Sequence, residues 1–350
     1  MGMKMLAKRL LAAGLYSLQV PQRKLSQPGT WRILMYHRVI EPEQSLYPLE
    51  EGIYTTPESF ARQMTWLKKH CQILSLAELV EELSKGNSNL TKAVAITFDD
   101  GWDDTCSNAY PILRDLNIPA TVFLATDYIG TDKLFWTDKV AIAVAAIEDG
   151  FLLTEAQDLL ITENKQYDQL LLEIFYTLAS GDTGVSTQTV IEYILRTFKG
   201  YNREQLKTVM EVIDKCFGKF IAQTPRQFLS WAEVQEMSQR GISFASHSHS
   251  HENLTGCLED FLRNDLTVTA DCFKNHKVKT LPVFCYPGGY YNDQTQAVLS
   301  ACGYQAALKV GCQSDLTANP MLLGRIGIHD DISSSDSMFA CRISLDFFSG

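Results

Sequence analysis

Short apolar segments bounded by turn residues alternate with amphipathic segments along most of this chain. Runs such as residues 93–98 have the length of buried strands, whereas the periodicity of residues 57–70 is typical of a helix. Strands separated by helices over this length indicate parallel βα units. The expected strands cover residues 33–36, 93–98, 120–125, 242–245, 282–286, 305–310 and 325–328, and the expected helices among them cover residues 57–70, 77–83 and 107–116.

The pattern changes between about residues 134 and 228, where helical segments follow one another without a strand. We interpret this stretch as a helical insertion in one larger domain that covers residues 31–350. A barrel is the arrangement that suits so many βα units, so the predicted fold class is α/β, a (β/α) barrel with a helical insertion. Helices are expected in the insertion at residues 141–146, 156–160, 169–178, 189–198 and 204–217.

Residues 1–30 form a basic, amphipathic N-terminal segment. Residues 1–40 contain seven lysines and arginines and no acidic residue. Since the whole chain has a net charge of −10, residues 41–350 have a net charge of −17. Residues 1–20 have the pattern of a helix. Its predicted apolar face carries Met3, Ala7, Leu10, Leu11 and Leu18, with Leu6 and Leu15 at the edges.

Three interpretations of this helix stay open. It can dock on the domain, lie on an anionic membrane surface as a peripheral contact, or be a signal peptide. Against a signal peptide, Gly14, Ser17 and Gln19 interrupt the apolar stretch, and no A-x-A cleavage site follows it. No run reaches about 18 apolar residues, so no transmembrane helix is expected.

The composition is that of an ordinary globular protein, with 45% hydrophobic and 21% charged residues among 350. The net charge of −10 disfavours nucleic-acid binding, which needs surplus positive charge. Nine cysteines are an odd number, and no C-x-x-C pair occurs, so reduced thiols are expected. Together with the N-terminal helix, these features predict a cytoplasmic protein that can associate with the inner face of the membrane.

Polar residues gather where the predicted strands end. The run at 93–98 is followed by Asp99, Asp100 and Gly101. Two adjacent carboxylates after a buried strand are costly unless they are paired or bind a metal, although a plain Asp-Gly turn is an alternative.

A histidine cluster follows the strand predicted at 242–245. His247, His249 and His251 are three of only seven histidines in the chain. A helical turn would bring the imidazoles at i and i+4 to one ion, whereas an extended chain would align all three. The spacing alone does not decide between these arrangements, and a surface histidine tract is the other alternative.

Two further strand ends repeat this theme. Gly288 and Gly289 follow one strand, and His329, Asp330 and Asp331 follow another. Each segment taken alone is more typical of a turn or a solvated loop. In barrels, however, the active site lies at the carboxyl ends of the strands, so the four ends together predict metal-assisted hydrolysis.

With these residues, the chain resembles the polysaccharide deacetylases, the NodB-homology proteins of carbohydrate esterase family 4. Residues 97–101 read T-F-D-D-G, and residues 246–251 have the pattern S-H-[ST]-x-x-H, two motifs of that family in the right order. The resemblance covers about residues 31–331 apart from the insertion. It implies a distorted (β/α) barrel that removes acetyl groups from sugars. Weaker matches lie at residues 34–39, 111–113, 120–123, 230–231 and 286–289.

The resemblance implies roles for the residues that match the motifs. Asp100, His247 and His251 would hold one divalent metal ion, usually Zn²⁺, whereas His249 would lie between the ligands without binding. Asp99 would be the general base that acts on metal-activated water.

The remaining implied roles are a general acid and an oxyanion donor. His329 follows an apolar strand as the last family motif requires and would be the general acid, with His37, at another strand end, as a second candidate. The N–H of Gly288 would stabilise the oxyanion, next to Tyr286 in the same substrate-binding segment.

The third family motif is altered. It usually reads R-x-P-[aromatic]-G, with the arginine orienting the catalytic base, but Cys285 takes the arginine position and Gly288 the aromatic one. We hypothesise that Arg325, at the next strand end, supplies the missing guanidinium. A surface arginine is the alternative.

Three functions from different classes follow. The first is a metal-dependent hydrolase of carbon–nitrogen bonds other than peptide bonds, which removes N-acetyl groups from a glycan or glycolipid. The second is a glycan-binding or glycan-assembly protein on the same fold, since the third motif lacks its arginine. The third is a metal hydrolase of a different amide or of an O-acetyl ester.

Overall fold

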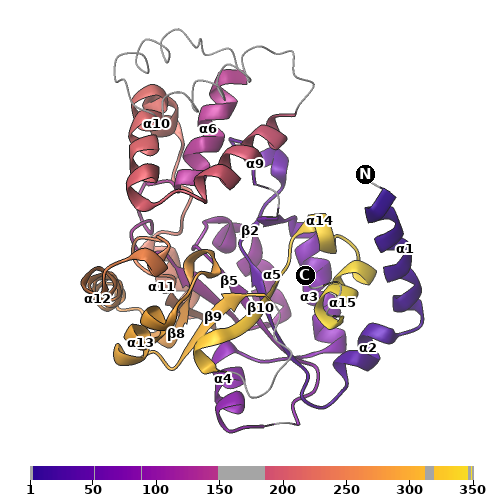
Figure 1. The fold of residues 1–350 in the computed structure, drawn as a ribbon. Coiled ribbons are helices and arrows are strands. Elements are labelled where there is room, and N and C mark those ends of the chain that lie inside the picture. Colours follow the sequence, from indigo (N-terminus) through magenta and orange to yellow (C-terminus); the bar gives the residue numbers. More distant parts are fainter. Residues whose placement is uncertain are drawn as a thin grey trace. The chain divides into compact units, whose positions relative to one another are not determined.

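The computed structural model describes residues 3–50, 52–87, 89–148, 186–311, 319–345 and 348, which form two compact units (Figure 1). The helices predicted at 156–160 and 169–178 lie outside the described residues. The first unit consists of Met1–Glu41, Gly52–Thr131 and Phe228–Gly350, and the second of Pro42–Glu51 and Asp132–Gln227.

The first unit contains a closed ring of parallel strands. The strands follow the order β1-β10-β9-β8-β7-β6-β5, and β5 pairs with β1 to close the ring, while β4 pairs with β5 alone. The predicted (β/α) barrel is confirmed. The strands are β1 (Trp31–Tyr36), β4 (Gln72–Ile73), β5 (Ala93–Phe98), β6 (Ala120–Leu124), β7 (Ile242–Ser246), β8 (Thr280–Cys285), β9 (Ala306–Val310) and β10 (Leu323–Gly327).

The ends of the seven predicted strands agree with the structure to within two residues. The short strands β2 (Arg38–Val39), β3 (Tyr54–Thr55) and β4 were not predicted, because two residues are too few to form an apolar pattern.

The helices of the first unit connect these strands, except for α1 and α2, which precede β1, and α14 and α15, which follow β10 (Figure 1). The helix predicted at 107–116 begins as a π-helical turn, Thr105–Ala109, because Pro111 has no N–H to donate in the next turn. The helices are α1 (Met3–Ser17), α2 (Val20–Leu25), α3 (Pro57–His70), α4 (Leu76–Ser84), α5 (Tyr110–Leu116), α11 (Trp231–Ser238), α12 (Glu259–Asn275), α13 (Asp293–Ala301), α14 (Asp330–Ser333) and α15 (Asp336–Ser344).

Side chains fix where several of these helices begin. Thr56 accepts a hydrogen bond from the N–H of Ser59 at the start of α3. Capping boxes start α4, with Ser75 and Glu78, and α11, with Ser230 and Glu233. Because these side chains satisfy first-turn groups that the helix leaves unpaired, they define the helix ends sharply.

The alternation of side chains along the strands divides the barrel core into two layers. Inside the ring, Ala95, Ala245 and Leu308 belong to one buried cluster. Outside it, Phe284 and Ala307 pack with residues of α12 and α13 in another cluster. The inward-pointing positions of the inner layer continue into the polar residues at the carboxyl ends of the strands.

The second unit has a core of its own. Ile191, Phe198 and Phe217 are at most 1% exposed, and Tyr47 packs in the same cluster. Residues 42–51 therefore join this helical unit, which the sequence pattern did not indicate. Its main helices, which include the segments predicted at 141–146, 189–198 and 204–217, are α6 (Trp136–Glu148), α9 (Thr187–Phe198) and α10 (Arg203–Gln223).

The N-terminal helix α1 packs against α15, but not with the face that the sequence predicted. Ala12 is fully buried, and Met5 and Leu15 pack in the same cluster, whereas Leu10 is 67% exposed. The small side chain of Ala12 allows the two helices to approach closely, with the Sγ of Cys341 3.8 Å from the Ala12 carbonyl. The predicted apolar face therefore points away from this contact.

Candidate active site

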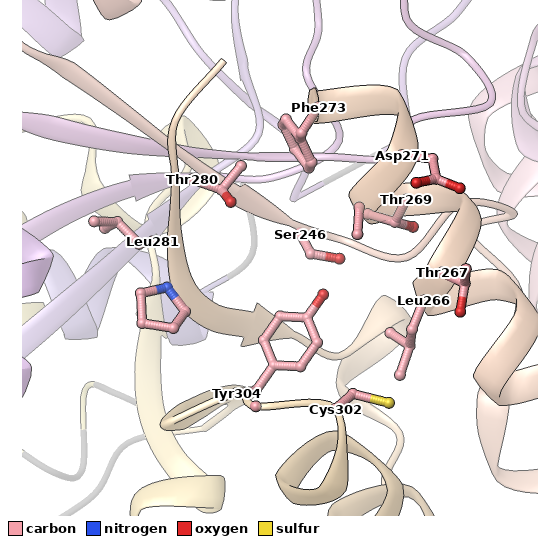
Figure 2. Close-up of a pocket in the computed structure, with 13 residues that line it drawn as sticks. Ser246, Leu266, Thr267, Thr269, Asp271, Phe273, Thr280, Leu281, Cys302 and Tyr304 are labelled. Carbon is pink, nitrogen blue, oxygen red and sulfur yellow. The ribbon is translucent and has the colours of Figure 1, made fainter. Parts of the chain in front are cut away.

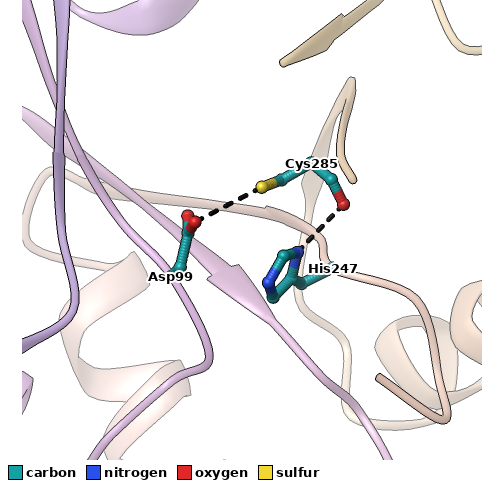
Figure 3. A group of neighbouring side chains, drawn as sticks. All are labelled: Asp99, His247 and Cys285. Atoms are coloured by element: carbon teal, nitrogen blue, oxygen red, sulfur yellow. Dashed lines mark hydrogen bonds between the residues drawn. The ribbon is translucent and has the colours of Figure 1, made fainter. Parts of the chain in front are cut away.

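Four strands bring polar side chains together inside the rim of the barrel. Asp99 follows β5, His247 follows β7, Cys285 ends β8, and Arg325 lies in β10. His247, Cys285 and Arg325 each lie two residues after a buried apolar residue on the inward face, and Asp99 lies two residues after the buried Thr97. All four are at most 2% exposed. Figure 3 shows Asp99, His247 and Cys285 converging from their strands.

Asp100, His247 and His251 lie within reach of one small cation. The Nε2 atoms of His247 and His251 are 3.3 and 3.2 Å from the same atom, Oδ1 of Asp100. One potential ligand atom from each residue lies within 4.8 Å of the other two. The sequence reasoning placed these three residues together, and the structure brings them together.

Hydrogen bonds from neighbouring groups orient these ligand atoms. Trp102 donates its Nε1–H to Oδ2 of Asp100 at 2.9 Å, which leaves Oδ1 facing the two histidines. Nδ1 of His247 lies 2.9 Å from the carbonyl oxygen of Cys285. Because a carbonyl only accepts, this nitrogen carries the proton, and Nε2 of the neutral ring presents a lone pair.

This donor set fits a divalent ion such as Zn²⁺. One carboxylate and two imidazoles are ligands of catalytic zinc sites and leave a position open. Burial by itself would raise the pKa of Asp100, but hydrogen bonds from His247 and His251 hold the pKa well below its usual value. Asp100 is thus ionised, and a buried carboxylate beside two imidazole nitrogens has the chemistry of a cation site.

The histidine loop adopts a strained backbone to reach this geometry. Asp100, Ser248 and His251 have φ angles of 73°, 66° and 57°, in the left-handed region that few non-glycine residues adopt. The buried carboxylate of Asp265 accepts hydrogen bonds from the N–H groups of residues 249 and 250, at 2.7 and 2.9 Å, and holds the loop. Such strain persists only where surrounding contacts determine the conformation.

His249 lies apart from the other two histidines of the cluster. Its Nδ1 is 3.0 Å from the hydroxyl of Thr126, and its Nε2 is 3.5 Å from Asp127. The i and i+4 imidazoles therefore meet without a helix, because the positive φ angles turn the chain.

A guanidinium group holds Asp99. Arg325 donates from Nη1 and Nη2 to the two carboxylate oxygens, both at 2.6 Å, and it is 1% exposed. Burial by itself would raise the pKa of Asp99, but the charge of Arg325, with smaller contributions from His247 and His37, lowers the pKa below its usual value. Asp99 is thus kept ionised in a dry environment, and Arg325 is not a surface arginine.

Cys285 occupies the space between these groups. Its Sγ accepts from Nη2 of Arg325 at 3.0 Å and donates to Asp99 at 3.5 Å. Asp99, His247 and Cys285 also have ligand atoms within 4.8 Å of one another (Figure 3). The permanent positive charge of Arg325 already neutralises that group, so we favour the cluster around Asp100 for a metal ion.

The two candidate acids have different surroundings. Nε2 of His37 lies 3.9 Å from Asp99, and the side chain is 24% exposed. Nδ1 of His329 lies 2.9 Å from Asp331, which also accepts from the N–H of Gly52. The ring of His329 therefore packs beside the segment that precedes β3, and His37 borders the general-base candidate.

The glycine turn after β8 lies at the same end of the barrel. Gly288 has a φ of 61°, and a Cβ there would come within 2.8 Å of the Tyr290 ring, so glycine is required. Tyr286 points the other way, into the outer core, and its hydroxyl donates to the carbonyl of Met321 at 3.1 Å. Its N–H bonds to Leu308. Since both groups are engaged elsewhere, we assign Tyr286 a packing role instead of substrate binding.

A separate cavity of 420 Å³ lies behind this rim (Figure 2). Its walls come from α12, from the start of β8 and from residues 302–304, and none of the predicted site residues line it. In Figure 2 the hydroxyl of Tyr304 points toward Ser246, which precedes His247 and faces outward on β7. The cavity is thus on the outer side of the barrel wall.

Sequence reasoning did not identify Trp102 or Asp265. Trp102 lies two residues after Asp100, and that proximity was a usable signal. Asp265 is in the middle of an unpredicted helix, and an isolated acidic residue in the sequence carries no signal that it will be buried.

A closed parallel barrel with a carboxylate–imidazole cluster at the carboxyl ends of its strands defines a class of candidate metal hydrolases. Comparison with known proteins is more specific. The family profile described as polysaccharide deacetylase matches residues 86–150 and 181–307, more than half of the chain. The chain therefore belongs to the polysaccharide deacetylase family, as the sequence motifs predicted.

Curated relatives match part of the chain. A poly-beta-1,6-N-acetyl-D-glucosamine N-deacetylase of Staphylococcus epidermidis is 36% identical over 107 residues, 28% of this chain and 37% of that protein. The putative polysaccharide deacetylase YxkH of Bacillus subtilis is 32% identical over 108 residues, 31% of this chain and 36% of that protein. The matched segments thus span little more than a third of either relative.

Solved structures share the fold over most of the chain. The deacetylase PplD of Streptococcus pyogenes, in complex with acetate, has a TM-score of 0.53 at 19% identity and covers 88% of this chain and 96% of its own. IcaB from Ammonifex degensii has a TM-score of 0.55 at 16% identity and covers 90% and 98%.

Proposed function

We propose that this protein is a metal-dependent deacetylase that hydrolyses N-acetyl groups of a glycan or glycolipid. The observation that carries the proposal is the pairing of two neighbouring groups at the rim. Asp100 gathers two imidazole Nε2 atoms around one oxygen, and Asp99 beside it is held ionised by a buried guanidinium. The names of the staphylococcal relatives support an N-acetylglucosamine polymer as the first substrate class to test.

Asp100, His247 and His251 would hold the metal ion. When bound, a Zn²⁺ ion supplies Lewis acidity, which lowers the pKa of water and polarises an acetyl carbonyl. The chain supplies the orientation of the ligands, through Trp102 and the carbonyl of Cys285.

Amide hydrolysis needs one group that takes a proton from water and one that gives a proton to the leaving nitrogen. Asp99 is the base in this proposal, and Arg325 orients it from β10 in place of the arginine that the third motif lacks. His37 is our choice as the acid because it borders Asp99 and its side chain is 24% exposed. His329 stays the alternative, and the N–H of Gly288 stays the predicted oxyanion donor.

The first experiment is elemental analysis of the purified protein, with Asp100→Ala and His247→Ala beside the wild type. About one zinc-like ion per wild-type chain, absent from both variants, would support the site. No ion in the wild type after incubation with divalent metals would contradict it. His249→Ala is the matched control, since this neighbouring histidine contacts Thr126 and should leave the metal content unchanged.

Turnover then separates the proposed function from a glycan-binding protein on the same fold. The metal-loaded protein should release acetate from N-acetylated glucosamine oligomers, with less release from O-acetyl esters. Oligomer binding without acetate release would favour the binding protein, and preference for O-acetyl esters would favour a different esterase.

A further inference from the structure

The outward face of α1 is apolar and exposed. At 3.6 residues per turn, Leu6, Leu10 and Leu11 lie within about 80° of the direction opposite to the buried Ala12, and Leu18 directly follows the last residue of α1. These leucines are 49%, 67%, 50% and 64% exposed. They account for four of the ten exposed large hydrophobic residues in the described part of the chain.

The contacts on the inward face hold this surface in place. Ala12 packs with Met338 and Cys341 of α15, and the Nε1–H of Trp66, in α3, donates to the hydroxyl of Tyr16 at 3.0 Å. The helix is therefore fixed by one face, and the leucines on its opposite face cannot turn inward without breaking these contacts.

Basic side chains flank the leucines. Arg9 is exposed beside one edge of the face, and Lys8 lies beside the other, with its Nζ 5.2 Å from the centre of the Phe348 ring. Arg23 and Lys24 are exposed on the adjacent α2. No acidic residue occurs in the first 40 positions, although the whole chain has a net charge of −10.

We propose that α1 lies in the surface of an anionic lipid bilayer, with Leu18 and the three exposed leucines of α1 at the acyl boundary and the flanking basic residues at the headgroups. An apolar face with a basic border is the property that lets a helix bind anionic lipid in the plane of the membrane. Within the described residues, no helix is long and apolar enough to cross a bilayer.

A second copy of the chain is a less suitable occupant. A symmetric dimer through this face would bring the basic borders of two copies together, because a two-fold interface pairs the same patch with itself. The repulsion would oppose the burial of the leucines, whereas an anionic membrane attracts both the charges and the apolar face.

Flotation of the purified full chain with lipid vesicles tests the proposal. We expect binding to vesicles of phosphatidylcholine with phosphatidylglycerol, weaker binding to phosphatidylcholine alone, and weakening with salt. Leu10→Glu should reduce the partition coefficient about tenfold or more, since it removes one leucine from the apolar boundary. Arg9→Gln should reduce it about fivefold, and only on anionic vesicles.

The matched control is Leu258→Glu, which makes the same change at a leucine that is 81% exposed elsewhere in the barrel unit. Equal loss of binding in Leu258→Glu and Leu10→Glu would overturn the proposal. A wild-type protein that does not bind anionic vesicles would also overturn it. A concentration-dependent dimer in vesicle-free buffer that Leu10→Glu abolishes would instead assign the face to a second copy. Vesicle binding is measured without turnover, so its result does not depend on the proposed hydrolysis.

Discussion

Asp99 and Asp100 are adjacent in the chain and almost equally buried, yet they have different partners. Asp99 continues the inward face of β5 and meets the permanent charge of Arg325. Asp100 turns away through a φ of 73°, and its Oδ1 lies beside the imidazoles of His247 and His251, which can be neutral. Two identical side chains thereby differ in role: the protein itself neutralises Asp99, whereas Asp100 is the proposed ligand of a cation.

The largest expected effect is a separation of metal binding from chemistry by the two carboxylates. Asp100→Asn should lose the bound ion and, with it, measurable turnover. Asp99→Asn should keep the ion and lose about 10²–10⁴-fold in kcat, the contribution of a general base. Metal analysis and acetate release on the same samples check this, and an Asp99→Asn protein without metal would contradict the division.

The choice between His37 and His329 comes next. His37→Gln should reduce kcat by about 10²-fold or more, because the leaving nitrogen then departs without its proton donor. His329→Gln should change kcat by less than about tenfold, since this ring contacts Asp331 and the segment at Gly52. The reverse ranking would restore His329 as the acid.

Removal of the guanidinium should affect both stability and rate. Arg325→Met leaves the buried carboxylate of Asp99 without its partner, which costs about 3–5 kcal/mol in the free energy of unfolding. Denaturant titration measures this, and the double variant Asp99→Asn/Arg325→Met should recover most of the loss. A single variant as stable as the wild type would show that the pair does not act as a unit.

The pH dependence of the activity that Arg325→Met retains tests whether Arg325 lowers the pKa of Asp99. The pKa of Asp99 is lowered in the folded protein, so the wild type should lose activity only as the pH falls through that low value. Without Arg325, burial raises the pKa with less opposition, although His37 and His247 still face the carboxylate and the Cys285 thiol contacts it. The acidic limb of kcat/KM should therefore move to higher pH, and an unmoved limb would exclude Arg325 as the orienting group.

Trp102→Phe should have the smallest of these effects. It keeps the aromatic ring and removes the N–H that fixes Oδ2 of Asp100, so metal affinity should fall about 10–100-fold. Competition with a chelator measures this. Trp231→Phe is the matched control because its ring stacks on His276, away from the metal ligands. Equal metal affinities in Trp102→Phe and Trp231→Phe would show that Trp102 does not orient Asp100 for metal binding.

Much of the barrel could be predicted because its signals are local. Strands such as 93–98 are continuous apolar runs between turn residues, and the helix at 57–70 was predicted to the residue. The short β4 and the helix α12 are two of the elements that were missed. β4 is only two residues long, and α12 carries Asp265 on its buried side, where a tertiary hydrogen bond replaces the expected apolar residue.

The sequence by itself determined the barrel class, the family and the residues that gather at the strand ends, since each follows from apolar runs and short motifs. Only the tertiary structure decided that Arg325 reaches Asp99, because the two are on strands far apart in the chain that share an inward face. It also decided which face of α1 is buried. Helical periodicity identifies an apolar face, but close packing selects the side where Ala12 lets α15 approach.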